Sequence, residues 1–291
     1  MKSAVISIDV EDWYHLEYFK DNLNDTSQSI LEEGVNNFMD ILSKENIKAT
    51  FFVVGELISQ NLELLKKIRR QGHEISGHSF CHVRPLNQSV EEFKHDSTKL
   101  LMELKEYLRI INPGYRAPCF SLDDERLKVL KDLNFSYDSS KISAGFHPLY
   151  GTINIEEYKK IYDNVYIENS FTEFELPTQR YWNKEIPISG GGYLRILPWF
   201  LFKYLLKRYL RENETYFFFI HPFELTKKQI SLAKDASITS RLRFMIGRSK
   251  GASRLIKVIK ILKEEGFHFV TFAEFHKELN HLKKMPLNKF E

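Results

Sequence analysis

The sequence predicts an α/β fold in which helices cover a parallel β-sheet or barrel. Segments typical of strands and of helices alternate four times between residues 4 and 140, and polar side chains follow several of the strands. Because crossovers between parallel strands are right-handed, the loops after the strands would gather at one rim. The chain of 291 residues, 43% of them hydrophobic, can bury a large core. No repeat or linker interrupts the chain, so we expect one domain over residues 1–291.

The first half of the chain contains five predicted strands and four predicted helices. The strands are expected at residues 4–8, 48–54, 73–77 and 134–140, with a further strand and turn beginning at 112–116, and the helices at 30–42, 57–70, 89–108 and from about 121. The first strand is an apolar run that ends at Asp9, as buried parallel strands do. Ser89 and Glu92 have the spacing of a capping box, and Ser121 with Asp124 repeats it.

The second half is less regular before residue 193. Strands are expected at 165–171, 173–176, 215–220 and 267–270, and helices at 198–211, at 252–265 and after a cap formed by Thr271 and Glu274. Residues 188–192 contain three consecutive glycines and predict a loop that is flexible or lies close to another segment. Residues 231–249 are polar and basic, which predicts a surface segment.

Composition and charge exclude several classes of protein. A net charge of +3 is too small to indicate nucleic-acid binding, and two cysteines rule out a disulfide framework. We see no secretory signal and no apolar stretch of bilayer length, so a cytoplasmic protein without a transmembrane segment is expected. Lys203, Lys207 and Arg211 recur at four-residue spacing, which indicates a solvated stripe, with peripheral membrane contact as the alternative. The sequence does not predict the oligomeric state.

Two histidines and a group of acids follow predicted strands and together suit a metal site. His78 and His82 lie four residues apart just after the third strand, and an acidic cluster follows the first. A hydrolytic site needs two or three His and carboxylate ligands, plus an open position where water is acidified. Asp9, at the strand end, is the candidate base, which leaves Glu11 or Asp12 as the acidic ligand.

Two further residues complete a catalytic set. Arg116 follows another predicted strand and is a partner for Asp9, whose burial without one would be costly. His221 ends an aromatic strand and could protonate a leaving nitrogen; alternatively it is a core histidine bonded to a carbonyl group.

A rival metal site consists of the two histidines and both cysteines, namely His78, Cys81, His82 and Cys119. This set would form a closed structural zinc site. It lacks the paired-cysteine spacing of such sites and leaves the acids of the first loop unexplained, so Cys81 is expected to pack inward instead.

Five motifs in order resemble the polysaccharide deacetylase family, carbohydrate esterase family four, over nearly the whole chain. They are Ser7-Ile-Asp9-Val-Glu-Asp12-Trp13, Gly72-His-Glu-Ile-Ser-Gly-His78-Ser-Phe-Cys-His82, Gly114-Tyr-Arg116-Ala-Pro118-Cys-Phe-Ser121, Tyr137-Asp138-Ser-Ser140 and Phe219-Ile-His221-Pro222. The segments Pro187-Ile-Ser-Gly-Gly-Gly-Tyr193-Leu-Arg195 and His221-Pro-Phe-Glu224 are similar to the branch associated with bacterial exopolysaccharide gene clusters.

The resemblance implies a distorted (β/α) barrel of seven strands, the NodB-homology fold, that removes N-acetyl groups from sugars with a divalent metal. Zinc is the common ion, with cobalt or another divalent ion as alternatives. The roles it implies are Asp9 as base, His78 and His82 as ligands, Arg116 steadying the base, His221 as acid and Asp138 orienting His221; donors in the loop Pro118, Cys119 and Phe120 would bind the substrate oxyanion. The family usually has adjacent aspartates in its first motif, whereas Val10 follows Asp9 here, so the ligand is Glu11 or Asp12.

Two other functions remain open from the sequence. One is a metal-independent amidohydrolase of the allantoinase kind, which shares the barrel but does not need the full ligand set. The other is a catalytically silent domain that binds glycans through its many aromatic residues. For the deacetylase, the N-acetylated sugar could be free, nucleotide-linked, lipid-linked or polymeric.

Overall fold

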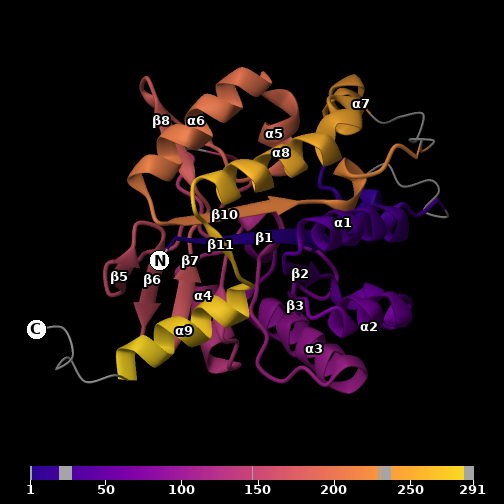
Figure 1. Cartoon of the computed structure of the whole chain (residues 1–291). Coiled ribbons are helices and arrows are strands. Elements are labelled where there is room, and N and C mark those ends of the chain that lie inside the picture. The colour runs from indigo at the N-terminus through magenta and orange to yellow at the C-terminus, as the bar shows by residue number, and fades with distance from the viewer. Residues whose placement is uncertain (1, 20–27, 146, 229, 231–236, 285–291) are drawn as a thin grey trace, which may run out of the picture.

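The centre of the computed structural model is a parallel sheet, and the structure describes residues 2–19, 28–145, 147–228, 230 and 237–284. Four strands lie in the order β10 (Thr215–Ile220), β1 (Ser3–Val10), β2 (Thr50–Val53) and β3 (Glu74–Gly77), all parallel (Figure 1). β11 (His268–Phe269) also pairs with the start of β1. Every residue of β1, β2 and β10 is buried, as expected for strands covered on both faces.

Isolated bridges extend this sheet into a distorted barrel. Tyr115 bridges in parallel to Gly77 at the end of β3 and to Asp138 in β4 (Tyr137–Asp138). β4 pairs in parallel with β7 (Phe171–Phe174), and Gly190 bridges to Phe219 of β10. The described residues form no ladder between β7 and β10, which is where the barrel departs most from regularity. The predicted barrel class is therefore confirmed.

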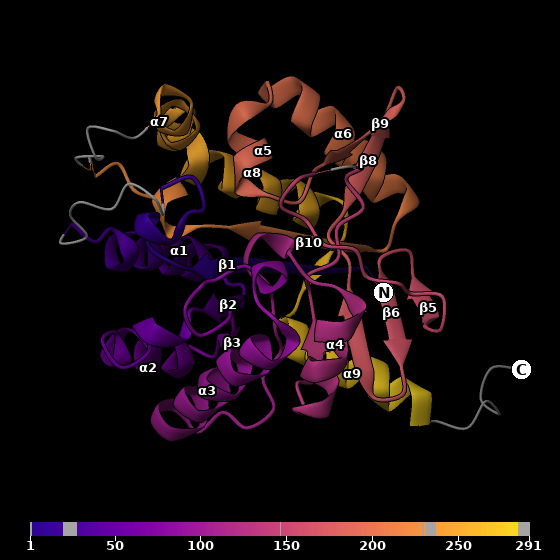
Figure 2. The ribbon, with the colours of Figure 1, turned by 180° about the vertical axis from the view of Figure 1, so that it is seen from behind.

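Nine helices in the described chain surround the barrel. They are α1 (Leu31–Glu45), α2 (Leu62–Arg70), α3 (Val90–Leu108), α4 (Asp124–Asp132), α5 (Gly191–Ile196), α6 (Trp199–Glu212), α7 (Ile238–Met245), α8 (Gly251–Glu264) and α9 (Phe272–Lys284). Figures 1 and 2 place α2 and α3 beside β2 and β3, whereas α5, α6 and α8 lie along the opposite edge, beyond β10. None of the described helices is long and apolar enough to cross a membrane.

Helix caps follow the predicted chemistry with one exception. The Ser89 side chain accepts a hydrogen bond from the Glu92 amide, and the Glu92 carboxylate accepts from the Ser89 amide. Thr271 and Glu274 make the same reciprocal pair. At α4, however, Asp123 and not Ser121 is the cap, because its carboxylate reaches the Arg126 amide at 3.0 Å.

Two strand predictions in the second half needed correction. The strands predicted at 165–171 and 173–176 are β6 (Val165–Glu168) and β7, and the turn between them lies at Asn169, with a φ of 52°. β5 (Lys159–Tyr162) and the hairpin of β8 (Thr178–Tyr181) and β9 (Lys184–Pro187) were not predicted. Most of their residues are partly or fully exposed, so the burial that creates an apolar pattern is missing.

Two predicted loops contain helices. Residues 231–236 lie outside the described residues, but α7 follows them, capped by Ser237 and held by the buried Phe244. The glycine segment begins α5 rather than remaining flexible. Its close approach to other segments was predicted correctly: a Cβ on Gly190 would lie 2.7 Å from the Phe219 ring, and one on Gly191 would lie 2.0 Å from Glu224 Oε2.

Candidate metal centre and active site

Glu11, His78 and His82 form a buried group in which one ligand atom from each lies within 4.8 Å of the others. β1 ends at Val10 and β3 ends at Gly77, so Glu11 and His78 are the first residues beyond their strands. The pairing of Val10 with Val53, and of Val53 with Gly77, puts the two strand ends at the same level. Parallel pairing therefore brings together residues that are far apart in sequence.

The backbone of β3 and its following loop orients both histidines. His78 Nδ1 lies 2.8 Å from the carbonyl oxygen of Arg116, to which it donates, so Nε2 carries the lone pair that faces the group. Burial lowers the pKa of His78 to about 4, which keeps the ring neutral as a ligand must be. His82 has a left-handed backbone, with a φ of 54°, and its amide donates to Ser79 Oγ at 2.8 Å. This tight turn aims the second imidazole at Glu11.

Glu11 has the properties of an anionic ligand. Its Oε2 is buried against His82 Nε2, and it accepts no well-formed hydrogen bond from the described residues. Burial alone would raise the pKa of Glu11, but His82, His221 and His78 together lower it well below its usual range. Two imidazoles and one carboxylate around a buried acceptor atom match the donor set of a catalytic zinc site. The group therefore fits a divalent ion.

The structure separates Glu11 from the other predicted ligand candidates. Asp12 caps the short 3-10 helix η1 (Trp13–His15), and its Oδ1 accepts from the amides of Trp13 at 2.8 Å and Ile30 at 3.3 Å. Of the two acidic alternatives, only Glu11 joins the described ligand group.

The rival site containing cysteine is also not formed. Cys81 is exposed rather than packed inward, and its thiol donates to Asp96 Oδ1 at 3.1 Å. The described metal-ligating group contains neither Cys81 nor Cys119.

Asp9 and Arg116 form the buried ion pair expected from the sequence. Arg116 Nη1 lies 2.8 Å from Asp9 Oδ1, and neither side chain is more than 3% exposed. The other guanidinium contacts go to Ser7 Oγ and to the carbonyl and hydroxyl of Ser139, all within 3.1 Å. The Phe52 ring lies beneath the guanidinium at 4.1 Å. With so many contacts, Arg116 fixes Asp9 in one position.

His221 follows β10 and faces both acids from the other side. Its Nε2 lies 3.3 Å from Glu11 Oε1 and 4.0 Å from Asp9 Oδ2. Its Nδ1 lies 3.1 Å from Glu224 Oε2, and Arg195 Nε in turn lies 2.6 Å from Glu224 Oε1. Burial would lower the pKa of His221, but the hydrogen bond to Glu224 and the nearby carboxylates raise it to about 9. The ring therefore carries a proton to donate at neutral pH.

The carboxylate that bonds His221 Nδ1 in the described residues is Glu224 and not Asp138, so the orienting role of Asp138 stays a prediction. Asp138 accepts hydrogen bonds from the amide and the hydroxyl of Ser140, both at 2.8 Å, and it also bonds Glu173, its partner in the β4–β7 ladder. Burial raises the pKa of Asp138 to about 6 and that of Glu173 well above its ordinary value. These two acids share a proton as a buried pair.

From the sequence, Glu224 and Arg195 are recognised only as residues of the family motifs, without a role. The signal that could have identified them is the spacing of His221 and Glu224 at the start of the 3-10 helix η6 (Pro222–Glu224), where the glutamate reaches back to both the ring and the amide of His221.

The predicted substrate loop forms the 3-10 helix η5 (Pro118–Phe120), two residues after Arg116. The Phe120 amide donates to the Ala117 carbonyl, so it cannot also hold an oxyanion. The Phe120 ring packs against Phe219 at 4.9 Å, on the strand that leads to His221. Substrate binding by Pro118, Cys119 and Phe120 stays a prediction.

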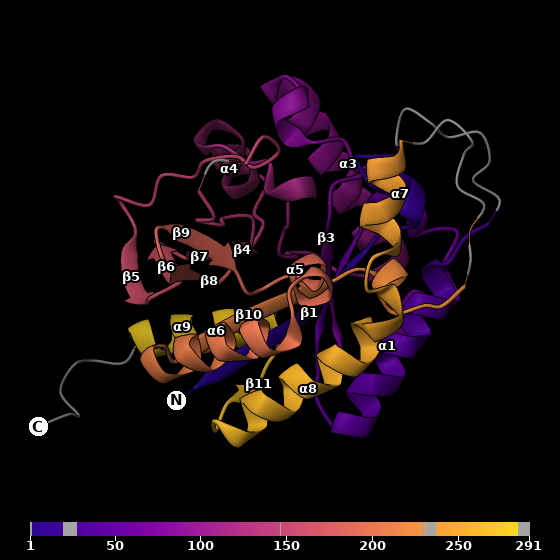
Figure 3. The same cartoon turned by 90° about the horizontal axis from the view of Figure 1, so that it is seen from above.

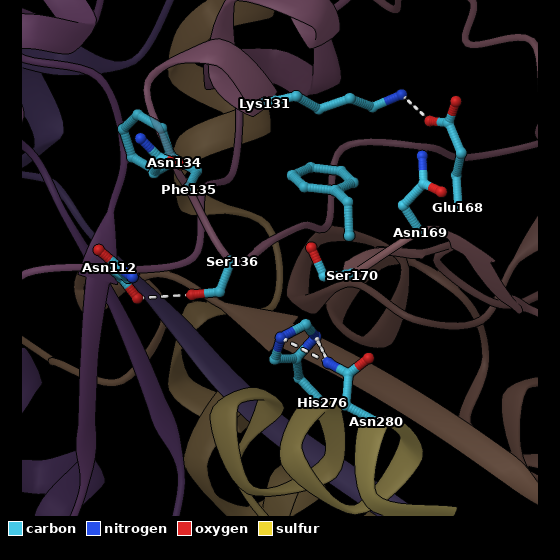
Figure 4. A pocket seen from close by; sticks show the side chains of 11 residues that line it. Asn112, Lys131, Asn134, Phe135, Ser136, Glu168, Asn169, Ser170, His276 and Asn280 are labelled. Carbon is cyan, nitrogen blue, oxygen red and sulfur yellow. Dashed lines mark hydrogen bonds and ion pairs between the residues drawn. The ribbon is translucent and has the colours of Figure 1, made fainter. Parts of the chain in front are cut away.

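A polar pocket of about 360 Å³ lies elsewhere, between α9 and the turns that precede β4 and β7 (Figure 4). Its lining includes His276, whose Nε2 accepts from Asn280 Nδ2 at 3.0 Å, and the ion pair of Lys131 with Glu168. Because β4 and β7 are parallel and the pocket precedes both, it lies at the opposite end of the barrel from the metal ligands.

Two family models match consecutive parts of the chain. Residues 21–137 match the model described as polysaccharide deacetylase, and residues 139–277 match a domain of unknown function, DUF3473. The candidate site draws on both parts, since His78 and Arg116 lie in the first and His221 and Glu224 in the second. β1 pairs with β10, which lies in the second matched part, and a single domain over residues 1–291 stays a prediction.

Two curated relatives are named as deacetylases. A peptidoglycan deacetylase of Helicobacter pylori is 22% identical over 288 residues, which cover 93% of this chain and 92% of that protein. A peptidoglycan-N-acetylglucosamine deacetylase of Listeria monocytogenes is 38% identical over 69 residues, only 24% of this chain and 14% of that protein.

Solved structures share the fold. A Mycobacterium smegmatis protein named as a polysaccharide deacetylase aligns with a TM-score of 0.62 at 18% identity, over 98% of this chain and 93% of that one. A family 4 acetyl xylan esterase of Clostridium thermocellum with bound cobalt aligns with a TM-score of 0.52 at 14% identity, over 98% of this chain and 93% of that one. A pseudoenzyme of the same family from Bacillus anthracis aligns with a TM-score of 0.53 at 17% identity, over 94% of this chain and 65% of that one. At these identities the likeness establishes the fold, while the family models assign residues 21–137 to polysaccharide deacetylase and residues 139–277 to DUF3473.

Proposed function

We propose that this protein is a metal-dependent hydrolase that removes N-acetyl groups from an N-acetylated glycan. The observation that carries the proposal is the buried group of Glu11, His78 and His82, with Asp9 and His221 facing it from two sides. A fold shared with a pseudoenzyme does not by itself indicate catalysis. Here, however, a complete set of ligands, acid and base converges on one point.

Each residue has one task in the proposed reaction. When bound, a divalent ion would polarise the amide carbonyl and acidify water. Asp9, fixed by Arg116, takes a proton from the water as its oxygen adds to the carbonyl carbon. His221 gives its Nε2 proton to the sugar nitrogen as the carbon–nitrogen bond breaks, which releases acetate and a free amine. Glu224, fixed by Arg195, holds the His221 ring with Nε2 toward the site.

We further propose zinc as the ion, with Glu11 rather than Asp12 as its acidic ligand. Two imidazole nitrogens and one carboxylate oxygen form a set typical of catalytic zinc, although cobalt is accepted by similar ligands. For the substrate, the names of the relatives favour a glycan that contains N-acetylglucosamine.

The test is acetate release from a panel of N-acetylated substrates. The purified protein is stripped of metal and assayed with chitin oligosaccharides, peptidoglycan and nucleotide-linked N-acetyl sugars, with and without added zinc or cobalt. We expect activity only with a divalent ion and one bound ion per chain. Activity that survives chelation would instead support the allantoinase-like alternative, and tight glycan binding without acetate release would support a silent binding domain.

A further inference from the structure

The helices beyond β10 carry an unusual charge distribution. Residues 187–211, which include α5 and most of α6, contain five Lys or Arg residues and no Asp or Glu. Residues 237–263, which include α7 and nearly all of α8, contain eight Lys or Arg residues and again no acid. Because the whole chain has a formal net charge of only +3, the remainder of the protein is acidic.

These segments form one continuous surface, which we call the basic face: α5, α6, α7, α8 and the β8–β9 hairpin, whose only acids are Glu185, Glu212 and Glu264. α5 packs against both α6 and α8, and Figures 1 and 2 both place these elements along one edge of the molecule. Seen from above, in Figure 3, α5 to α8 spread side by side across this edge. The exposed bases of the face are Arg180, Lys184, Lys203, Arg208, Arg211, Arg243, Lys250, Lys257, Lys260 and Lys263.

The basic face also exposes large apolar side chains. Trp182, at the tip of the hairpin, is 84% exposed, Phe200 on α6 is 76% exposed, and Ile238 on α7 is 77% exposed. On α7, Ile238 is followed by exposed Leu242, Met245 and Ile246, a spacing that gives one apolar stripe on its outer side. The opposite side of α7 is fixed to the protein by Phe244, which stacks on Phe223 at 5.2 Å.

We propose that the basic face binds the surface of a bilayer containing anionic lipid. Cationic side chains interspersed with protruding aromatic and aliphatic groups complement both features of such a surface, the negative headgroups and the apolar interior. A soluble polyanion would make ionic contacts with the basic side chains but would not provide an apolar environment for Phe200 or Leu242. The contact lies beside the candidate active site, because Phe223 follows His221 by two residues.

The proposal is tested by flotation of the full-length protein with phosphatidylcholine vesicles, with and without phosphatidylglycerol. We expect anionic vesicles to bind at least about tenfold more tightly than neutral ones, and high salt to remove most of this difference. Phe200→Ser with Leu242→Ser should weaken binding at least about tenfold. Lys203→Glu with Arg243→Glu and Lys260→Glu should do the same.

Matched controls come from α3, α4 and the segment between them, at the far side of the molecule. Met102→Ser with Ile111→Ser removes apolar groups that are comparably exposed, and Lys94→Glu with Lys105→Glu and Lys128→Glu reverses the same number of exposed charges. Both should bind vesicles like the unmodified protein. Three results would each overturn the proposal. The first is a loss of vesicle binding that is equal in the control and the basic-face variants, and the second is no binding to anionic vesicles. The third is equally tight binding to a soluble acidic polysaccharide that is unchanged when Phe200 and Leu242 are replaced.

A second measurement needs no variant that could misfold. Of the three tryptophans, Trp13 is buried and Trp199 is partly buried, whereas Trp182 is almost fully exposed, so insertion of the hairpin tip should shift tryptophan fluorescence to shorter wavelength when anionic vesicles are added. Trp182→Phe should abolish most of the shift. An unchanged spectrum at saturating vesicles would contradict insertion of the apolar groups.

Discussion

The two sides of the candidate site differ in how their side chains are held. On the first side, Glu11 and His78 are the residues directly after β1 and β3, and the sheet itself sets their positions. On the second side, His221 also directly follows a strand, β10, but its ring is held by two further side chains, Glu224 and then Arg195. A side chain that is positioned by the backbone of a strand has little freedom to move. A side chain that is held through successive ion pairs can lose one partner and keep part of its orientation. We therefore expect single substitutions on the first side to remove most of the activity, and single substitutions on the second side to lower it in smaller steps.

The largest effect is expected from removing a ligand on the first side. Glu11→Gln and His78→Ala should each abolish stoichiometric metal binding and lower kcat by at least about 10³-fold, because the ion contributes several kcal/mol of transition-state stabilisation. Metal content by mass spectrometry and acetate release measure the two effects.

Asp12→Asn is the matched control, since an asparagine oxygen can still accept from the Trp13 and Ile30 amides. It should retain the ion. Loss of metal from this variant, with normal content in Glu11→Gln, would reverse the ligand assignment.

Substitution of the base is expected to lower catalysis without changing metal binding. Asp9→Asn keeps an acceptor for Arg116 but cannot take a proton from water, so kcat should fall about 10²- to 10⁴-fold while the metal content stays at one ion. Arg116 is fully buried, so the loss of its charged partner should also lower the melting temperature. Near-normal kcat in a folded, metal-loaded variant would rule out Asp9 as the base.

A smaller effect is expected on the second side. Glu224→Gln preserves the size of the side chain but removes the charge that holds Arg195 and His221, so kcat should fall roughly 10- to 100-fold with metal content unchanged. Asp138→Asn, measured in parallel, should lower kcat much less, because Asp138 bonds Ser140 and Glu173 rather than His221. The reverse order of effects would support the role for Asp138 implied by the resemblance.

The same contrast explains what the sequence alone could predict. The first strand is visible as an apolar run that stops at Asp9, and a short strand is predicted up to Gly77, so the pattern is sufficient to place His78 and the acidic cluster together. The choice between Glu11 and Asp12 depends on which carboxylate caps the start of η1, and the pattern of apolar and polar residues does not indicate this.

The sequence did not predict side-chain contacts between residues that are far apart along the chain. Nothing in the local pattern around Arg195 indicates that it reaches Glu224, 29 residues away, because α5 is positioned by its packing on β10 and α8. The β8–β9 hairpin and α7 were missed for a related reason: both leave much of their apolar surface exposed, so they lack the periodicity that burial imposes.

The smallest effect concerns the acid pair at the junction of the two matched segments. Burial and the nearby Asp138 raise the pKa of Glu173 well above 4.5, so the folded protein keeps a proton that the unfolded chain releases near its ordinary pKa. Stability from this group is therefore complete below pH 4.5 and declines as the pH rises toward the folded-state pKa, by up to about 1.4 kcal/mol per pH unit. Glu173→Gln replaces the protonated acid with a neutral amide that can still donate to Asp138 and accept from the Lys141 amide.

This variant should unfold with a flatter pH dependence between about pH 5 and 7, and at neutral pH its melting temperature should match or exceed that of the unmodified protein by roughly 2–6 °C. Thermal unfolding followed by circular dichroism at several pH values provides the comparison. Parallel pH profiles for the two proteins would show that Glu173 is ionised in the fold. Because the pair makes no described contact with His221, kcat should change little, which distinguishes these acids from the ones that face the metal ligands.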